Sequence, residues 1–497
     1  MRVLMVFPDL ARDVTNYTGV LSPAVALISG MLKDAGHQVE LYHMYREPTE
    51  QEFRARIRGA NADLVAFSIN SHYRRRMVPW SRWAHEESGA PVAVGGVHAT
   101  LAPAEMSAIP DVDYTCVGEG ELAILELCDA LENGRDTSRI QNFWVRTPDG
   151  IVKNNGRPLI QNLDDIPDPD YGIYDVDNLY HVKRGLFPYL MSRGCSFKCT
   201  YCSIPAMMEM SGERESSFWR FLSPERAVGQ MRALMDAHMP YAERVHFLDA
   251  IFFSSKNWLK EFAVLYKEQI GLPFSCNLRA DYVTKTTTAI LKDMGCEVVR
   301  FGVESGDDEM NARVLLRGLS IDKIRRAFDM LAAAGIQRVS YNLVGLPEEN
   351  LALSLKTVRL NAELEPDIAI PFIFYPYPGT ALYEKCKQEG YLTDREYDNY
   401  FIGVTTDMPD FRASDILFVH RFFHRIMALY RVGKALPSPL DRWWMDTVDV
   451  VLRSPLFPRA LLVRWREAYK ALRQSIGERL VHRSPRLYRL LGGTGPA

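Results

Sequence analysis

Three cysteines lie within eight residues of one another, in the stretch "SRGCSFKCTYCSIP". They are Cys195, Cys199 and Cys202, and the spacing C-x3-C-x2-C brings three thiolates together on one tight loop. Soft thiolates select zinc, copper(I) or iron–sulfur clusters. Eight cysteines in 497 residues are too few for a disulfide scaffold. We therefore expect these three cysteines to bind a metal.

The number of thiolates narrows the choice of metal. A structural zinc site takes a fourth ligand, usually from a second close pair, whereas Cys276 and Cys296 each stand alone in the sequence. Zinc is thereby disfavoured but stays an alternative. A [4Fe–4S] cluster ordinarily takes four thiolates, so three thiolates leave one iron open. An open iron can bind the amino and carboxylate groups of S-adenosylmethionine (SAM), and electron transfer then breaks a carbon–sulfur bond to release a 5′-deoxyadenosyl radical.

Two series of alternating strands and helices position these residues. In residues 1–125 short apolar runs alternate with helical patterns, which predicts an α/β domain with a parallel, Rossmann-like sheet covered on both faces. From Phe187 six further strand–helix units follow and predict a full or partial (β/α)6 barrel, whose site gathers at the carboxyl ends of the strands. The three cysteines come just after the first of those strands.

The chain divides into four parts on this reading. We expect a first domain over 1–145, a linker rich in Pro, Asp and Asn over 146–184, a barrel over 185–400 and a helical basic region over 401–497. The apolar runs are too short to span a membrane and the N-terminus lacks the pattern of a signal peptide, so a reducing cytoplasm is expected.

The cysteine stretch resembles a known signature. "CSFKCTYC" is similar to the signature of the radical SAM enzymes, including the aromatic Tyr201 before the last cysteine. "FGVESG", "YNLVGLPEE" and "FYPYPGT" resemble the later-strand motifs of the same family, in the same order. The resemblance implies a [4Fe–4S] cluster, SAM and an external one-electron reductant such as flavodoxin or ferredoxin.

The same resemblance implies a set of SAM contacts. Asp249 resembles the group near the methionine amine, and a salt bridge at the barrel rim is the alternative for Asp249 and Arg279. The backbone around Val344 and Gly345 would line the adenine. The full implied set is Tyr201, Asp249, Asn277, Arg279, Glu304, Val344 and Gly345.

The first domain ends one strand on two glycines, in "VAVGGVHAT". Gly95 and Gly96 let a backbone approach a ligand closely, and a doubly wound sheet binds ligands beyond the carboxyl ends of its strands. No G-x-G-x-x-G follows a strand, so a nicotinamide or flavin site is disfavoured. "GGVHAT" followed by "VDYTCVGEGE" resembles the cobalamin-binding domain that precedes the radical barrel in one large subfamily. The implied cobalamin contacts are Ser68, Asn70, His72, Gly95, Gly96, His98, Gly118 and Glu119.

One departure from the cobalamin proteins concerns the cobalt. Members that supply a histidine ligand carry D-x-H-x-x-G after the first strand, whereas this chain has "PDLARDVTNYTG". We therefore expect no histidine on cobalt, with Ser68 and Asn70 facing the corrin tail. His72 is expected to be a solvated loop residue, with contact to the cobalt as the alternative. His98 is expected to contact the edge of the cofactor rather than the metal.

The resemblance implies a cobalamin-dependent radical SAM enzyme, most simply a methyltransferase acting on an unactivated carbon of a small-molecule or lipid-like substrate. An oxidative ring closure on a porphyrin-like or lipid skeleton is the alternative within enzymes. A non-catalytic cobalamin or redox sensor is a remote third.

The C-terminal region is strongly basic. Residues 421–497 carry fifteen Lys and Arg against five Asp and Glu. Apolar residues at helical spacing indicate either a helix packed on the barrel or an interfacial helix drawn to anionic lipid. No nucleic-acid motif accompanies the charge, so no nucleic-acid partner is expected. The helix would contain Leu462, Arg464, Trp465, Arg466, Tyr469, Lys470, Leu472, Arg473, Ile476 and Leu480.

Overall fold

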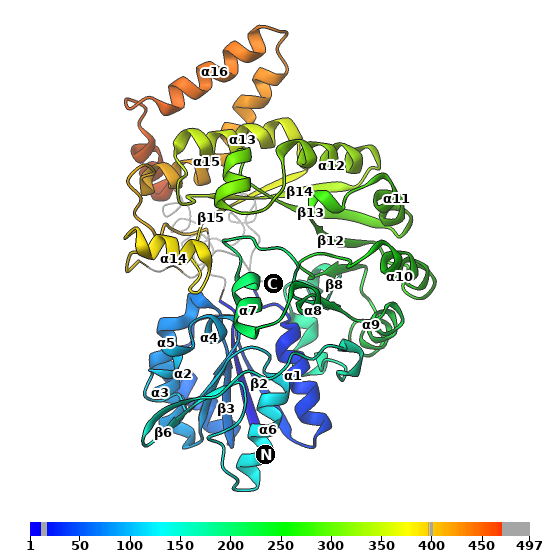
Figure 1. Ribbon diagram of the computed structural model, residues 1–497, viewed down its shortest axis with the longest axis vertical. Coiled ribbons are helices and arrows are strands. Elements are labelled where there is room, and N and C mark those ends of the chain that lie inside the picture. Colours follow the sequence, from blue (N-terminus) through cyan, green and yellow to red (C-terminus); the bar gives the residue numbers. More distant parts are fainter. Residues whose placement is uncertain (11–16, 396, 398–400, 470–497) are drawn as a thin grey trace, which may run out of the picture.

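Two parallel β-sheets, one in each half of the molecule, organise the computed structural model (Figure 1), which describes residues 1–10, 17–395, 397 and 401–469. The first sheet has the order β2-β1-β3-β4-β5-β6-β7. Its strands are β1 (Arg2–Pro8), β2 (Gln38–Met44), β3 (Leu64–Ser68), β4 (Val92–Gly95), β5 (Tyr114–Cys116), β6 (Phe143–Thr147) and β7 (Gly150–Lys153). The first five are parallel, which confirms the Rossmann-like fold expected from the sequence.

Helices cover both faces of this first sheet, because each carries an apolar stripe. In α2 the buried side chains are Phe53, Ile57 and Ala60, at helical spacing, and Thr49 forms a capping box at its start. The helices are α1 (Pro23–Asp34), α2 (Glu50–Ala60), α3 (Met77–Ser88), α4 (Val97–Leu101), α5 (Pro103–Ser107) and α6 (Glu121–Glu132), with the 3-10 turn η1 (Ser71–Arg76).

The antiparallel hairpin β6–β7 extends the first sheet beyond the expected boundary. β6 pairs with β5, and β7 pairs with β6 through Lys153. The sheet therefore continues past residue 145 into the segment expected to be linker. The rest of that segment, residues 154–185, is a strap of short turns that contacts both halves: Lys33 of α1 pairs with Asp170, and the Tyr171 hydroxyl donates to the Pro188 carbonyl.

The second sheet is a partial barrel of six parallel strands in the order β15-β14-β13-β12-β11-β8. The strands are β8 (Leu186–Tyr189), β11 (Arg244–Phe247), β12 (Phe274–Leu278), β13 (Cys296–Glu304), β14 (Gln337–Val344) and β15 (Ile368–Ile373). The helices on its outer face are α9 (Pro224–His238), α10 (Lys256–Gln269), α11 (Lys285–Asp293), α12 (Ile321–Ala333) and α13 (Leu351–Leu364), whereas α14 (Ala381–Gln388) lies beyond the carboxyl end of β15, where the Leu382 amide donates to the Thr200 carbonyl. The six expected units are confirmed.

Three short elements fill the space between the halves. A ribbon of β9 (Ser192–Arg193) and β10 (Arg220–Phe221) follows β8, with α7 (Ser203–Ser211) and α8 (Glu215–Phe218) between its strands. α7 lies between the two halves in Figure 1. A continuous apolar core joins α1 and α6, the strap and the inner strands of the barrel. The two halves therefore pack as one body around these elements.

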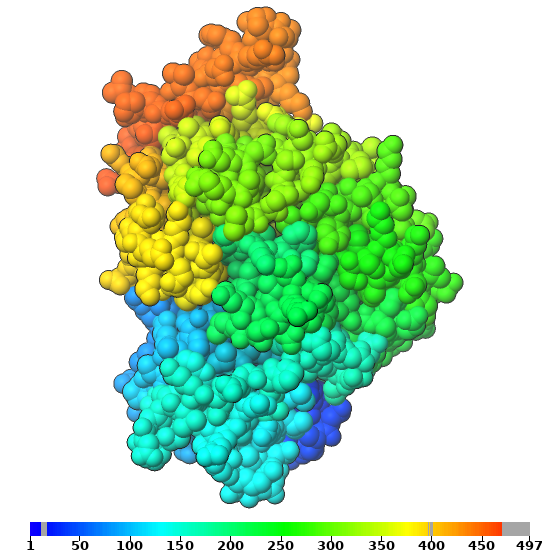
Figure 2. Space-filling view, viewed as in Figure 1, coloured from blue at the N-terminus to red at the C-terminus, as the bar shows by residue number. Residues whose placement is uncertain are grey.

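The C-terminal region is helical, as expected. α15 (Ala413–Lys434) packs on α13 and β15 through a second apolar core, and α16 (Leu440–Arg453) packs on α15. Figure 2 shows α16 projecting at one end of the molecule. Among the described residues, no helix has the length and apolarity to cross a membrane.

Candidate cofactor site between the two halves

The cysteine loop starts where β9 ends. Gly194 has φ +81°, and a Cβ there would lie 2.3 Å from the Phe218 carbonyl oxygen, so the turn requires glycine. Cys195 and Cys199 follow in the loop, and Cys202 immediately precedes α7. The chain thus carries the three cysteines from the carboxyl end of β8 to the segments that follow β13 and β15, where Thr200 is hydrogen-bonded to Leu315 and Leu382.

The three thiols can serve one metal centre. All three are free of disulfides and half-buried on one short loop. A structural zinc site would take a fourth ligand, whereas a [4Fe–4S] cluster held by three thiolates keeps one iron open for a ligand. Burial raises the pKa of the Cys202 thiol to about 12, a cost that a cationic metal centre would offset. The residues present therefore fit an iron–sulfur cluster.

Tyr201 and Glu304 meet beside this loop. The Tyr201 hydroxyl donates to Glu304 Oε1 over 3.1 Å, and Glu304, at the end of β13, has φ +61°. Burial raises the pKa of Glu304. A non-glycine residue at positive φ is a strained backbone that the surroundings must hold, and such residues cluster at functional sites.

Asp249 and Asn277 extend the site along the strand ends. Asp249 follows β11 and is fully buried, and its Oδ1 accepts hydrogen bonds from the Met191 amide and the Ser192 hydroxyl. Its Oδ2 has no hydrogen-bond partner among the described residues, and burial raises its pKa to about 7. Asn277 donates to the Asp249 carbonyl over 2.9 Å. A buried carboxylate oxygen without a donor fits a site that receives a ligand amine.

The end of β14 is shaped by a carboxylate that sequence reasoning did not assign. Glu349 Oε2 accepts from the amides of Gly345 and Leu346, over 2.7 and 3.0 Å, and is fully buried. Its pKa is raised to about 7, chiefly by burial. Val344 is buried, and Gly345 packs toward Ile416 of α15. Glu349 therefore fixes the backbone turn expected to line the adenine.

Both histidines singled out in the first domain are buried, and one of them lies elsewhere than expected. His72 is only 8% exposed, because its ring packs 4.6 Å from Tyr375 of the barrel and its Nδ1 lies 3.0 Å from the Tyr397 carbonyl. The expectation of a solvated His72 is thus wrong. His98 is fully buried between Ser71 and Glu105, so its contact with a cofactor edge stays a prediction.

The remaining first-domain residues lie at the carboxyl ends of β3, β4 and β5. Ser68 ends β3, and Asn70 caps η1 by accepting from the His72 amide. Gly95 ends β4, and the next residue, Gly96, has φ +95°; a Cβ on it would lie 2.6 Å from the Ile69 carbonyl oxygen. The neighbouring loop of this chain therefore already requires the glycine at 96, whatever ligand binds there.

A cavity of about 520 Å³ lies between the halves. Gly96, Thr100 and Gly118 line it from the first domain, while the strap, the β9–β10 ribbon and α7 line the other side. Met207 and Met210 of α7, just after the cysteines, contribute apolar surface. The cavity thus extends from the carboxyl edge of the first sheet to Gly194 and α7, on either side of the three cysteines, although none of the cysteines is among its lining residues.

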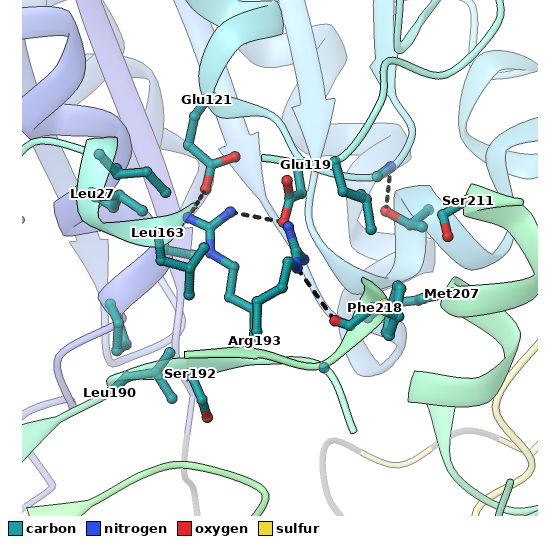
Figure 3. Close-up of a pocket in the computed structure, with 18 of the residues that line it drawn as sticks. Leu27, Glu119, Glu121, Leu163, Leu190, Ser192, Arg193, Met207, Ser211 and Phe218 are labelled. Carbon is teal, nitrogen blue, oxygen red and sulfur yellow. Dashed lines mark hydrogen bonds and ion pairs between the residues drawn. The ribbon is translucent and has the colours of Figure 1, made fainter. Parts of the chain in front are cut away.

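Buried ion pairs form one wall of this cavity (Figure 3). Arg193 reaches between Glu119, at 2.9 Å, and Glu121, at 2.7 Å, and Arg220 binds Glu119 over 2.8 Å. Arg193 and Arg220 face each other across the β9–β10 ribbon. Glu119, expected to contact cobalamin, therefore joins the first domain to the strand that precedes Cys195.

Several of these residues carried no signal that a single sequence reveals. Arg193, Arg220 and Glu121 pair only after the chain folds, across up to about a hundred positions of sequence. Arg317 is an isolated arginine in the sequence, yet the structure buries it beside Glu304. Glu349 lies within "YNLVGLPEE", so the motif indicated its neighbourhood but not its role.

Comparisons with known proteins agree with this arrangement. The radical SAM superfamily model matches residues 189–360, and the B12 binding domain model matches residues 16–128. An uncharacterized methyltransferase of Pyrococcus horikoshii is 26% identical over 411 residues, covering 80% of this chain and 86% of that protein. The anaerobic magnesium-protoporphyrin IX monomethyl ester cyclase of Rubrivivax gelatinosus is 24% identical over 430 residues, covering 81% and 73%.

A solved structure has the same fold. The radical SAM methyltransferase TsrM from Kitasatospora setae, with cobalamin and a [4Fe–4S] cluster bound, superposes with a TM-score of 0.63 at 16% identity, covering 91% of this chain and 89% of that chain. The B12 binding domain model matches the domain of the first sheet, and the radical SAM model matches the barrel. The cofactors that these two models imply are a [4Fe–4S] cluster, SAM and cobalamin. This chain belongs to the cobalamin-binding radical SAM enzymes.

Proposed function

We propose that this protein is a cobalamin-dependent radical SAM methyltransferase. The observation that carries the proposal is the cavity between the halves, because it extends from the carboxyl edge of the first sheet to Gly194 and Ile204, the residues on either side of the three cysteines. One side of the cavity lies against the matched B12 binding domain and the other against the matched radical SAM domain. Similarity to the methyltransferase of Pyrococcus horikoshii supports the reaction class.

Each group of residues has a role in this proposal. Cys195, Cys199 and Cys202 hold the cluster, Asp249 and Glu304 face bound SAM, and Glu349 fixes the turn beside the adenine. When bound, the cofactors supply a 5′-deoxyadenosyl radical that removes hydrogen from carbon and a methyl group for the resulting carbon radical. The protein itself orients these groups and excludes water, and it requires an external one-electron reductant.

Ring formation is the competing reaction, and one observation favours it: the similarity to the cyclase of Rubrivivax gelatinosus covers 81% of this chain. The two reactions differ in what happens to a methyl label. Cell extracts with and without the gene would be incubated with the reconstituted protein, reductant and methyl-deuterated SAM, and then compared by mass spectrometry. A product that gains one deuterated methyl group supports the methyltransferase. A product that loses hydrogen without gaining label would contradict the methyltransferase proposal and support ring formation.

We also propose that α16 contacts an anionic membrane surface, which suits a lipid-like substrate. Its outer stripe is apolar and exposed, with Trp443 at 64% and Val450 at 71% exposure. Such a stripe binds interfaces through apolar burial. Because α16 itself carries three Asp against two Arg, the attraction to anionic lipid comes from the basic residues before and after it in 421–497. In the tail, Trp465 and Tyr469 are also exposed, whereas Arg466 lies over the Phe422 ring. The expected helix positions Lys470, Leu472, Arg473, Ile476 and Leu480 lie outside the described residues.

Co-sedimentation with anionic vesicles tests the membrane contact. We expect the protein to sediment with the vesicles at low salt and to be released as salt screens the charge. Changing both Trp443 and Val450 to Ser should weaken sedimentation. Val264→Ser, which removes an exposed valine (57%) from α10, should not weaken it. If the wild-type protein stays in the supernatant at low salt, the proposed membrane contact is wrong, and the support that it gives to a lipid-like substrate is lost.

A further inference from the structure

Arg279 lies directly beside one of the three cysteines. It follows β12, is only 8% exposed, and its Nη1 lies 3.9 Å from Cys199 Sγ, within hydrogen-bond range for sulfur. Sequence resemblance places this arginine among the contacts of SAM. The geometry instead directs one of its nitrogens at a thiol expected to ligate iron.

The guanidinium of Arg279 is fixed in this direction by its other contacts. Nε and Nη2 each donate to Asp281 over 3.1 Å, and Nη2 also donates to the Arg317 carbonyl over 2.8 Å. One face of the guanidinium stacks on the Phe197 ring at 3.5 Å. Nε and Nη2 are therefore engaged by protein oxygens, and Nη1 is held toward Cys199. Because these contacts already fix the guanidinium, little side-chain entropy is lost when the cluster binds.

A second buried arginine, Arg317, helps to hold Arg279 in place. Arg317 is 4% exposed and its guanidinium donates to the carbonyls of Gly302 and Val303, at the end of β13. The Arg317 carbonyl oxygen accepts the hydrogen bond from Arg279 Nη2. The position of Arg279 therefore depends on that of Arg317. The acidic groups near them are Asp281, which pairs with Arg279, and Glu304. Two guanidiniums thus flank the side of the loop that carries Cys199.

We propose that Arg279 acts on the cluster: it donates a hydrogen bond to the Cys199 sulfur and, with Arg317, makes the cluster easier to reduce. The physical reason is charge. Reduction by the external one-electron reductant adds one electron to the cluster, and the added negative charge is stabilised by hydrogen bonds to sulfur and by nearby cations. The inference deepens the proposed function, since it rests on the three cysteines ligating the cluster.

The test is a redox titration of the reconstituted protein, followed by electron paramagnetic resonance in the absence of SAM. Arg279→Gln removes the charge, and we expect reduction to become about tenfold less favourable, which is about 59 mV for one electron. Asp281→Asn removes the counter-charge, so its potential should shift in the opposite direction. Arg244→Gln serves as the matched control, because Arg244 pairs with Glu297 at the amino end of β11 and should leave the potential unchanged.

Opposite shifts in Arg279→Gln and Asp281→Asn would support the proposal. Equal potentials in wild type and Arg279→Gln, at equal iron content, would overturn it. A shift that appears only after SAM is added would overturn it too, because it would assign Arg279 to SAM. If Arg279→Gln assembles no cluster, the same titration is done on Arg279→Lys and Asp281→Asn. Potentials equal to that of the wild type in both variants would then overturn the proposal. A wild type without a cluster overturns the proposed function as well, whereas an intact cluster with no shift overturns this inference alone.

Discussion

Removing Glu119 should destabilise the protein far more than removing an exposed carboxylate. Its Oε1 lies 2.9 Å from Arg193 and 2.8 Å from Arg220, and its Oε2 accepts from the Ile160 amide. Burial raises the pKa of Glu119, but the hydrogen bond to Arg220 and the charge of Arg193 hold it below its usual value. The side chain of Arg220 is only 6% exposed, so Glu119→Ala would leave a buried cation without its carboxylate.

The expected cost follows from this burial. Breaking a buried ion pair by removing one partner costs about 3 to 5 kcal/mol, and we expect the lower end, about 3 kcal/mol, because Glu121 still pairs with Arg193. The matched control is Glu297→Ala, which breaks a pair whose side chains are both 47% exposed, and should cost no more than about 1 kcal/mol. Urea unfolding of the cofactor-free protein, followed by tryptophan fluorescence, measures both.

Two further results follow from the same reasoning. Combining Glu119→Ala with Arg220→Met removes the orphaned cation as well, so part of the lost stability should return. Because the folded pKa of Glu119 is lowered, its contribution is present at neutral pH and should be lost as the pH falls below the usual pKa of a glutamate and through the lowered folded pKa. Equal losses in Glu119→Ala and Glu297→Ala would refute the reasoning.

Asp249→Asn should change how stability depends on pH: burial raises the Asp249 pKa to about 7, so the folded protein holds a proton that the unfolded chain releases. Wild-type stability relative to the variant should therefore fall by on the order of 3 kcal/mol from about pH 5 to about pH 8 in urea unfolding, and a constant difference would contradict this. For His72, whose ring already packs on Tyr375, the cobalt(II) protein should show no nitrogen splitting in its electron paramagnetic resonance spectrum. Splitting that disappears in His72→Ala would reverse that prediction.

The fold could be predicted because its pattern is local. Each barrel strand is a short apolar run followed by a helix, as in β13 and the amphipathic α12, and the period of the apolar residues identifies both. The expected linker over 146–184 begins inside the β6–β7 hairpin, because the Pro, Asp and Asn residues that follow it are typical of a connecting segment and β7 is a short, mostly exposed strand. Only the pairing with β5 makes the hairpin part of the sheet.

The site could be predicted in part. The cysteines and Glu304 belong to compact motifs, so their neighbourhood is readable from the sequence. The burial of His72 depends on how the two halves pack, and the pairing of Glu119 with Arg193 joins residues far apart in the sequence. Such contacts come from tertiary packing and leave no periodic signal.

The most direct test of the central claim is anaerobic cleavage of SAM by the reconstituted, reduced protein, with Cys199→Ala as the comparison. The wild type should hold an oxygen-sensitive [4Fe–4S] cluster and release 5′-deoxyadenosine, whereas the variant should release none. A wild type that binds cobalamin but releases no 5′-deoxyadenosine, or a Cys199→Ala protein that cleaves SAM at the wild-type rate, would contradict the account.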